Sequence, residues 1–187
     1  MNGPSLACPA TTRCAFLGPS HHMKNALALL IFLTSMTTTA QQEPKATNAG
    51  EHALDFWIGE WDLTWNDTVH GTNSIRLEMD GKVIAEHFDD PTNKYRGGSW
   101  SVYNAKTGIW NQTWVDTQGD YIALTGGPVE DRFELSTGPR EVKGVMTTHR
   151  MVFSNILKDS FDWDWQQTTD EGKTWSSQWK IRYQRRK

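Results

Sequence analysis

The sequence predicts an all-β fold: a single antiparallel up-and-down β-barrel of about ten strands, with a short N-terminal helix. Apolar and polar residues alternate with period two through most of the chain after residue 60, as in Trp61, Leu63 and Trp65. Short turn sequences rich in glycine, proline, asparagine and aspartate separate these alternating runs. No run with helical periodicity lies between them, which disfavours a parallel sheet.

The first forty residues have the composition of an export signal. They contain no Asp or Glu, and Lys24 precedes an apolar run at 26–33 and a small-residue stretch that ends at Ala40. This order is typical of a secretory signal peptide, and the run is too short to span a bilayer. The alternative, a buried core helix, lacks an amphipathic segment to pack on. We therefore expect a signal peptide over 23–40, an over-extended N-terminus over 1–22, and a periplasmic or secreted location.

Cleavage after Ala40 would remove both cysteines, Cys8 and Cys14, together with Arg13 and Lys24. The mature chain would then have neither a disulfide nor thiol chemistry. It would carry 22 acidic and 17 basic residues. This acidic balance argues against nucleic acid and against an anionic membrane surface as partners, and nothing in the mature chain predicts membrane insertion.

The segment 41–52 is polar and irregular and is interpreted as a linker. Asn48 and Glu51 have the spacing of a helix-capping pair, and apolar residues that include Trp57 recur after them at helical spacing. These features predict a helix of about two turns that ends at Gly59.

Ten strands follow within a barrel domain at 53–187. Asp80-Gly81 is a strong signal for a two-residue hairpin, and Gly126-Gly127-Pro128 and Thr137-Gly138-Pro139 are also interpreted as turns. An open meander would expose two edges and one apolar face, so closure into a barrel with room for one small ligand is expected. The predicted strands span 60–67, 72–79, 82–89, 97–104, 108–116, 119–125, 130–136, 143–153, 160–168 and 175–184.

Gly59-Glu60-Trp61 opens the first predicted strand directly after the helix. Here the sequence resembles the calycin group of lipocalins, fatty-acid-binding proteins and nitrobindin-like barrels. In lipocalins a Gly-x-Trp motif begins the first strand and its Trp packs under a basic residue near the last strand. The wider pattern at 55–61 resembles a bacterial family of exported proteins in or near that group. The resemblance covers 53–187 and implies that Trp61 and either Arg182 or Arg185 close the barrel floor by a cation–π contact.

The segment from Thr168 to Trp175 fits the Asp-box pattern of sialidases and related propellers. It occurs once, whereas propellers repeat it in each blade, so we interpret it as a hairpin turn. In this turn Asp170 would accept backbone amides, Gly172 would take a positive φ, and Trp175 would pack beneath.

The histidines of the mature chain do not have the spacing of a zinc motif. His149 shares a predicted face with Met151 and Phe153. The resemblance to nitrobindin-like barrels raises haem ligation by a histidine as an idea, but no motif singles one out. We therefore predict neither a metal site nor a cofactor.

All ten tryptophans lie after residue 40, and they either fill the barrel or wall a ligand site. Gln112 and Trp114 must share a strand face because side chains alternate with period two. Arg150 would carry a charge into the lumen if its face points inward, where it would meet a ligand anion or a paired carboxylate. The predicted ligand site comprises Trp100, Gln112, Trp114, Arg150 and Trp163.

Three functions remain open at this point. The first is an exported protein that binds a small apolar or amphipathic molecule in a Trp-lined barrel. The second is a hydrolase or isomerase that uses Glu86, Asp116 or Arg150 in the lumen. The third is a solid barrel that acts through protein–protein contacts. A cavity would favour the first two, and a carboxylate with a strongly perturbed pKa inside it would favour the second.

Overall fold

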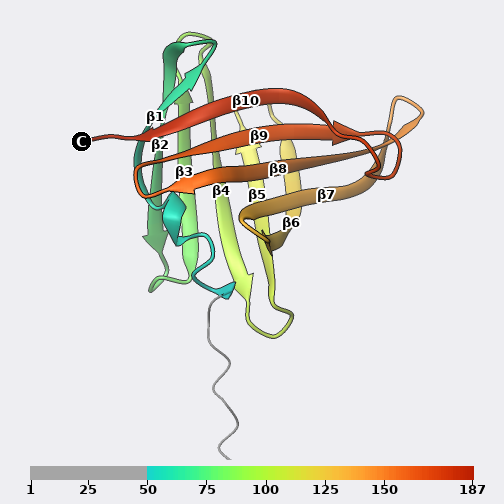
Figure 1. Cartoon of the computed structure of the whole chain (residues 1–187), viewed down its shortest axis with the longest axis horizontal. Helices are drawn as coiled ribbons and strands as arrows, with labels where there is room; N and C mark the ends of the chain where they lie inside the picture. The colour runs from blue at the N-terminus through green and yellow to red at the C-terminus, as the bar shows by residue number, and fades with distance from the viewer. Residues whose placement is uncertain (1–49) are drawn as a thin grey trace, which may run out of the picture. The chain divides into compact units, whose positions relative to one another are not determined.

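The chain folds into a closed barrel of ten antiparallel strands in which each strand pairs with the next and β10 pairs with β1 (Figure 1). This computed structural model describes residues 50–187. The predicted all-β, up-and-down topology is therefore confirmed. The predicted signal peptide, the residues before it and most of the predicted linker lie outside the described residues. Within 50–187, no helix is both long and apolar enough to cross a membrane.

The strand boundaries follow the alternation in the sequence, and every hairpin joins neighbours in the barrel. The strands are β1 (Gly59–Trp65), β2 (Thr68–Glu78), β3 (Val83–Asp90), β4 (Tyr95–Asn104), β5 (Ile109–Asp116), β6 (Tyr121–Val129), β7 (Arg132–Val142), β8 (Val145–Leu157), β9 (Ser160–Thr168) and β10 (Ser176–Arg185).

Two predicted turns are instead parts of strands. Gly126-Gly127-Pro128 lies within β6, where a side chain on Gly126 would collide with the Glu134 carbonyl of β7. Thr137-Gly138-Pro139 lies within β7, beside a register shift between Ser136 and Pro139. Glycine therefore allows close strand approach in the first case, and the proline sits at an irregularity in the ladder in the second.

The predicted N-terminal helix is shorter than expected. A 3-10 turn of three residues, η2 (Asp55–Trp57), stands directly before β1 in place of the expected two-turn helix, and its N-cap residue Leu54 makes no side-chain capping bond. Glu51, the expected capping partner, accepts a hydrogen bond from Lys82 Nζ at 2.6 Å instead. The Glu51 carboxylate is therefore used to tie the segment before β1 to the β2–β3 hairpin.

The η2 end of the barrel is closed by a buried aromatic plug. Trp61 has an exposed fraction of 0%, and its Nε1 donates to the Trp57 carbonyl at 2.7 Å. The Arg185 guanidinium lies 4.2 Å from the Trp61 ring centroid and donates to the Ile58 carbonyl at 2.9 Å. The cation–π contact implied by the calycin resemblance is thus present, and Arg185 makes it. Arg182 pairs instead with Asp162 at 2.8 Å.

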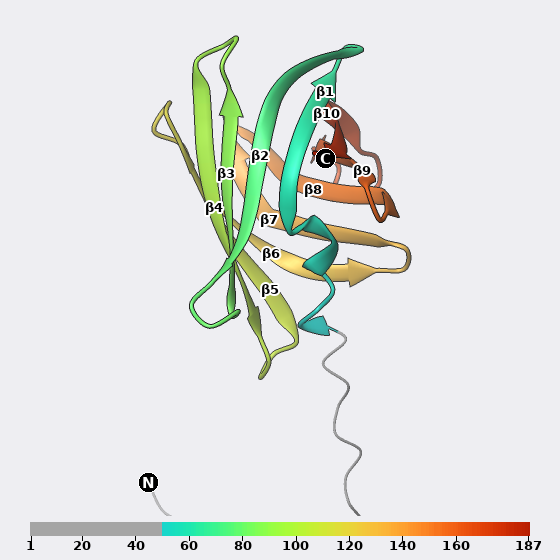
Figure 2. The same cartoon turned by 90° about the vertical axis from the view of Figure 1, so that its left-hand side faces the viewer.

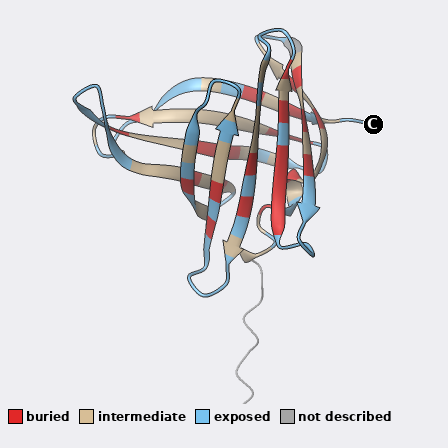
Figure 3. Ribbon diagram, turned by 180° about the vertical axis from the view of Figure 1, so that it is seen from behind, coloured by how far each residue is buried: buried red, intermediate tan, exposed pale blue. Residues whose placement is uncertain are grey.

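The opposite end carries the β1–β2 and β3–β4 hairpins (Figure 2). Buried residues recur at every second position in parts of β1, β4, β7 and β10, as expected when one strand face lines the lumen (Figure 3). The inward-facing rings near these hairpins, such as Trp114 and Trp165, are only partly buried. The barrel is therefore sealed at the η2 end and more open at this end, which we call the mouth.

The Asp-box segment forms the β9–β10 turn, as predicted. Asp170 accepts hydrogen bonds from the Thr174 amide at 2.9 Å and from the Thr174 hydroxyl at 2.6 Å. These bonds hold the pKa of Asp170 far below its usual range. Gly172 has φ +87° and lies against the Trp175 ring. The described contacts of this motif are those of a structural turn.

Candidate functional site

A cavity of about 120 Å³ lies inside the barrel towards the mouth. Its walls are aromatic: Phe88, Tyr95, Trp114, Trp163, Trp165 and Trp179. Aliphatic side chains fill the spaces between the rings: Ile122, Leu124, Met151 and Ile181. Two polar residues, Glu86 and Tyr183, complete the lining. The site is thus an apolar chamber with few polar groups, which is the usual make-up of a small-molecule pocket.

The tryptophans on β9 and β10 form one wall of this cavity. Trp163 and Trp165 are two residues apart on β9 and stack with an interplanar angle of 7° and centroids 6.4 Å apart. Trp179 of β10 meets Trp163 edge to face, at 5.8 Å and 84°. Edge-to-face contacts of this kind fix the rings without closing the space in front of them.

Asp116 holds the facing wall in place. Its Oδ2 accepts hydrogen bonds from the Tyr95 hydroxyl at 2.9 Å and from Trp114 Nε1 at 3.0 Å, and its Oδ1 accepts from the backbone amides of Gln118 and Asp120. Burial alone would raise the pKa of Asp116, but these hydrogen bonds outweigh it and lower the pKa. The Asp116 carboxylate thus orients the Tyr95 and Trp114 rings through hydrogen bonds. Asp116 itself does not line the cavity.

Gly97 makes room for the Trp114 ring. It pairs with Asp116 across β4 and β5, and a Cβ on Gly97 would collide with the six-membered part of that ring. The ring that approaches this part of the β4 backbone is therefore Trp114. A glycine is required here because only a residue without a side chain lets the indole lie on the strand.

Glu86 lies at the base of the cavity with an exposed fraction of 6%. It sits in the middle of β3, and its carboxylate accepts hydrogen bonds from Asn73 Nδ2 at 2.7 Å and from Ser99 Oγ at 2.5 Å. Burial raises the pKa of Glu86 to about 7, although the hydrogen bonds from Ser99 and Asn73 oppose the rise. Glu86 therefore changes its charge near neutral pH.

Asn73 links Glu86 to Tyr183. Its Nδ2 also lies 3.1 Å from the Tyr183 hydroxyl, and burial together with the Glu86 charge raises the pKa of Tyr183 well above its usual value. Asn73 Oδ1 is buried and has no hydrogen-bond partner among the described residues. Glu86, Asn73 and Tyr183 thus form a small polar cluster at the base of an otherwise apolar cavity. In this cluster the Asn73 Oδ1 acceptor is unused.

Of the five predicted site residues, Trp114 and Trp163 line the cavity. Gln112 faces the interior with an exposed fraction of 2%, but it lies deeper than the cavity and donates to Ser101 Oγ at 2.9 Å. The other two predicted residues lie elsewhere.

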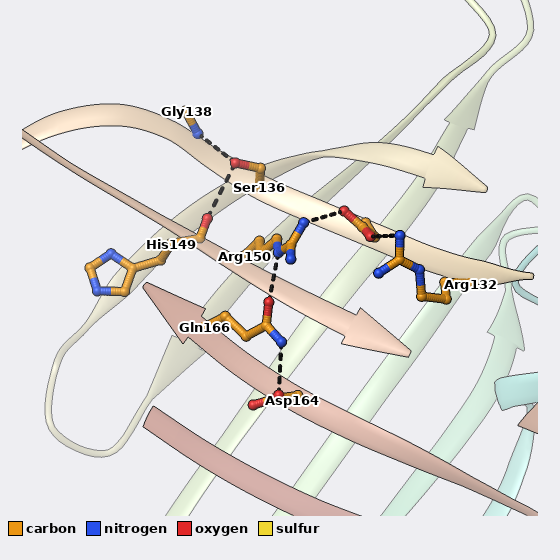
Figure 4. Close-up of polar contacts among 8 residues, drawn as sticks. Arg132, Ser136, Gly138, His149, Arg150, Asp164 and Gln166 are labelled. Atoms are coloured by element: carbon orange, nitrogen blue, oxygen red, sulfur yellow. Dashed lines mark hydrogen bonds and ion pairs between the residues drawn. The ribbon is translucent and has the colours of Figure 1, made fainter. Parts of the chain in front are cut away.

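Arg150 and Trp100 are on the outer face of the barrel, so their predicted inward orientation is wrong. Met151, the next residue after Arg150, lines the cavity, and alternation therefore turns Arg150 outward. There it binds Gln166 at 2.8 Å (Figure 4). It also binds Glu134 at 2.9 Å. Its guanidinium also lies 3.9 Å from the Trp175 ring centroid. Trp100 is 43% exposed.

No model of a known protein family matches the chain, and no curated protein matches it. What supports the calycin resemblance is the architecture alone, because the chain forms a closed antiparallel barrel of ten strands. Because one barrel architecture serves many functions, function has to be argued from the cavity of this chain.

His149, the histidine considered for haem ligation from the sequence, contacts Trp165 and Arg140. Its ring stacks on Trp165 at 5.3 Å, and Arg140 Nη2 lies 3.5 Å from its Nδ1. Burial and the Arg140 charge lower the pKa of His149. Within residues 50–187, no group of three or more His, Cys, Asp or Glu side chains is arranged to hold a metal ion.

Sequence reasoning missed Glu86 as a ligand contact, although it named Glu86 as a candidate acid or base. It also missed Tyr95, Trp165 and Trp179. The period-two alternation of β9 does place Trp165 on the face of Trp163. The signal for Trp165 was therefore present, whereas the meeting of β3, β4 and β10 at one cavity depends on barrel closure.

Proposed function

We propose that this protein binds a small, partly apolar molecule in the aromatic cavity. The observation that carries the proposal is a chamber with partly exposed tryptophans near the mouth and a polar base at Glu86, in a barrel closed at the other end. Such a chamber admits a ligand from one side, surrounds its apolar part with rings and offers a hydrogen-bonding group to its polar end. A solid barrel, the third hypothesis, would leave no such space.

Trp163→Ala is expected to weaken ligand binding by about tenfold or more, because the substitution removes one ring of the cavity wall. Trp100→Ala is the matched control, since Trp100 lies on the outer face and is expected to leave affinity unchanged. Small molecules that co-purify with the protein are identified by mass spectrometry and then titrated while tryptophan fluorescence is followed. Equal losses in the two variants would contradict a site in the cavity, and so would a protein that holds no ligand.

A second candidate function, that of a hydrolase or isomerase, is supported by one residue, Glu86. A carboxyl group whose pKa is raised to about 7 is suited to general acid–base chemistry at neutral pH. Of the other two residues named from the sequence, Arg150 is outside the barrel and Asp116 is bonded to the backbone and to the rings. A hydrolase or isomerase would therefore use Glu86. Conversion of a co-purified compound by the parent protein, but not by Glu86→Gln, would establish this activity.

We also propose that the chain is exported and begins at or near Gln41 in its mature form. The order of Lys24, the apolar run at 26–33 and the small residues up to Ala40 supports this. N-terminal sequencing of protein recovered from the cell envelope or the medium is expected to start near Gln41. A product that still begins before Lys24 would contradict export by this signal.

A further inference from the structure

The residues that line the cavity include one acidic side chain and no basic side chain. Glu86 is the only Asp, Glu, Lys, Arg or His side chain among the lining residues. Within 50–187, no basic side chain forms an ion pair with Glu86, in contrast to Glu134, which is paired with Arg150. An ionised carboxylate that is buried without a countercharge is costly, so a positively charged occupant would stabilise it.

The hydrogen bonding of Glu86 leaves acceptor positions free. Each carboxylate oxygen accepts one described hydrogen bond, from Asn73 at Oε1 and from Ser99 at Oε2. A carboxylate oxygen can accept two, so each retains one acceptor position. An N–H group of a bound ligand can use these positions without displacing either protein donor.

The aromatic walls favour the same charge. Four indole rings line the cavity together with Phe88 and Tyr95, and the negative π-face of an aromatic ring attracts a cation. The mutually perpendicular Trp163 and Trp179 rings approach the cavity in different orientations. A cation bound in this cavity would therefore lie among aromatic rings.

We propose that the cavity selects a small organic ammonium ion, with Glu86 as its counter-ion and the tryptophans as its walls. This inference rests on the proposed binding function and names its ligand class. The volume of about 120 Å³ limits the occupant to a molecule of roughly the size of a single substituted ring, since an engineered cavity of about 150 Å³ in another protein holds benzene.

The test compares three probes of similar size and different charge: benzylammonium, benzyl alcohol and benzoate. Titrations are made with the parent protein at about pH 8, above the pKa of Glu86. Benzylammonium is expected to bind at least tenfold more tightly than benzyl alcohol, and benzoate to bind most weakly. Benzyl alcohol or benzoate binding as tightly as benzylammonium would overturn the charge preference and leave the proposed binding function standing.

The Glu86→Gln variant tests whether the charge of Glu86 causes the preference for a cation. The variant keeps the size of the side chain and one acceptor oxygen, replaces the other oxygen by an amide donor and removes the charge. The ratio of benzylammonium to benzyl alcohol affinity is expected to fall towards one. A ratio that persists in the folded variant would overturn the role of Glu86. If none of the three probes binds the parent protein, the inference falls. The proposed function falls with it only if mass spectrometry also finds no co-purified ligand.

Discussion

Trp61→Ala is expected to lower the free energy of unfolding by about 3–5 kcal/mol, the range for truncating a fully buried aromatic residue. The Trp61 ring lies 4.9 Å from Phe161 and 6.0 Å from Tyr183, both edge to face. Its loss would also leave the Trp57 carbonyl without its indole donor and Arg185 without its ring. The space left by the missing Trp61 ring cannot close easily, because the closed barrel fixes the strands on all sides.

Trp175→Ala is the matched comparison and is expected to cost clearly less than Trp61→Ala. Trp175 is partly exposed beside the β9–β10 turn, where its contacts are Gly172 and the Arg150 guanidinium. Chemical denaturation of both variants measures the two losses. The reverse order would remove the argument that Trp61 is the plug of the barrel floor.

The sequence was sufficient for the barrel because its signals are local. Alternation in Trp61, Leu63 and Trp65 sets the period, and Asp80-Gly81 marks a hairpin that forms with a loop of four residues between Glu78 and Val83. The Gly-x-Trp motif predicted the floor contact, although Arg182 and Arg185 could be distinguished only once β10 had a register against β1.

The candidate site was harder to predict because it depends on which way each strand faces. Val152 shares the strand face of Arg150 and is apolar, but it lies on the outside of the barrel and is still buried there, with an exposed fraction of 4%. A buried apolar neighbour therefore does not identify the inner face of β8. Trp100 is a large ring on the outer face, which composition cannot distinguish from an interior ring. Whether a side chain points into or out of the barrel depends on the register of several strands, and no local sequence pattern determines it.

The stability of the barrel is expected to fall by about 3 kcal/mol, through Glu86 alone, as the pH rises from its ordinary pKa of 4.5 to the folded-state pKa of about 7. The folded-state pKa is raised, so the folded protein binds more protons than the unfolded chain in this interval. The contribution of Glu86 to stability is therefore fully present below about pH 4.5 and is lost as the pH rises through about 7.

Glu86→Gln isolates this effect, because other groups also titrate in this range. Urea denaturation at several pH values is expected to show that the difference in unfolding free energy between the parent and this variant changes by about 3 kcal/mol across the interval. Glu78→Gln, at an exposed position on β2, is the matched control and is expected to show no such change. A constant difference for Glu86→Gln would mean that the pKa of Glu86 is the same in the folded and the unfolded protein, so that the carboxyl is already ionised over most of this interval. The cavity would then already stabilise a negative charge, and a cationic ligand would have no uncompensated charge to neutralise.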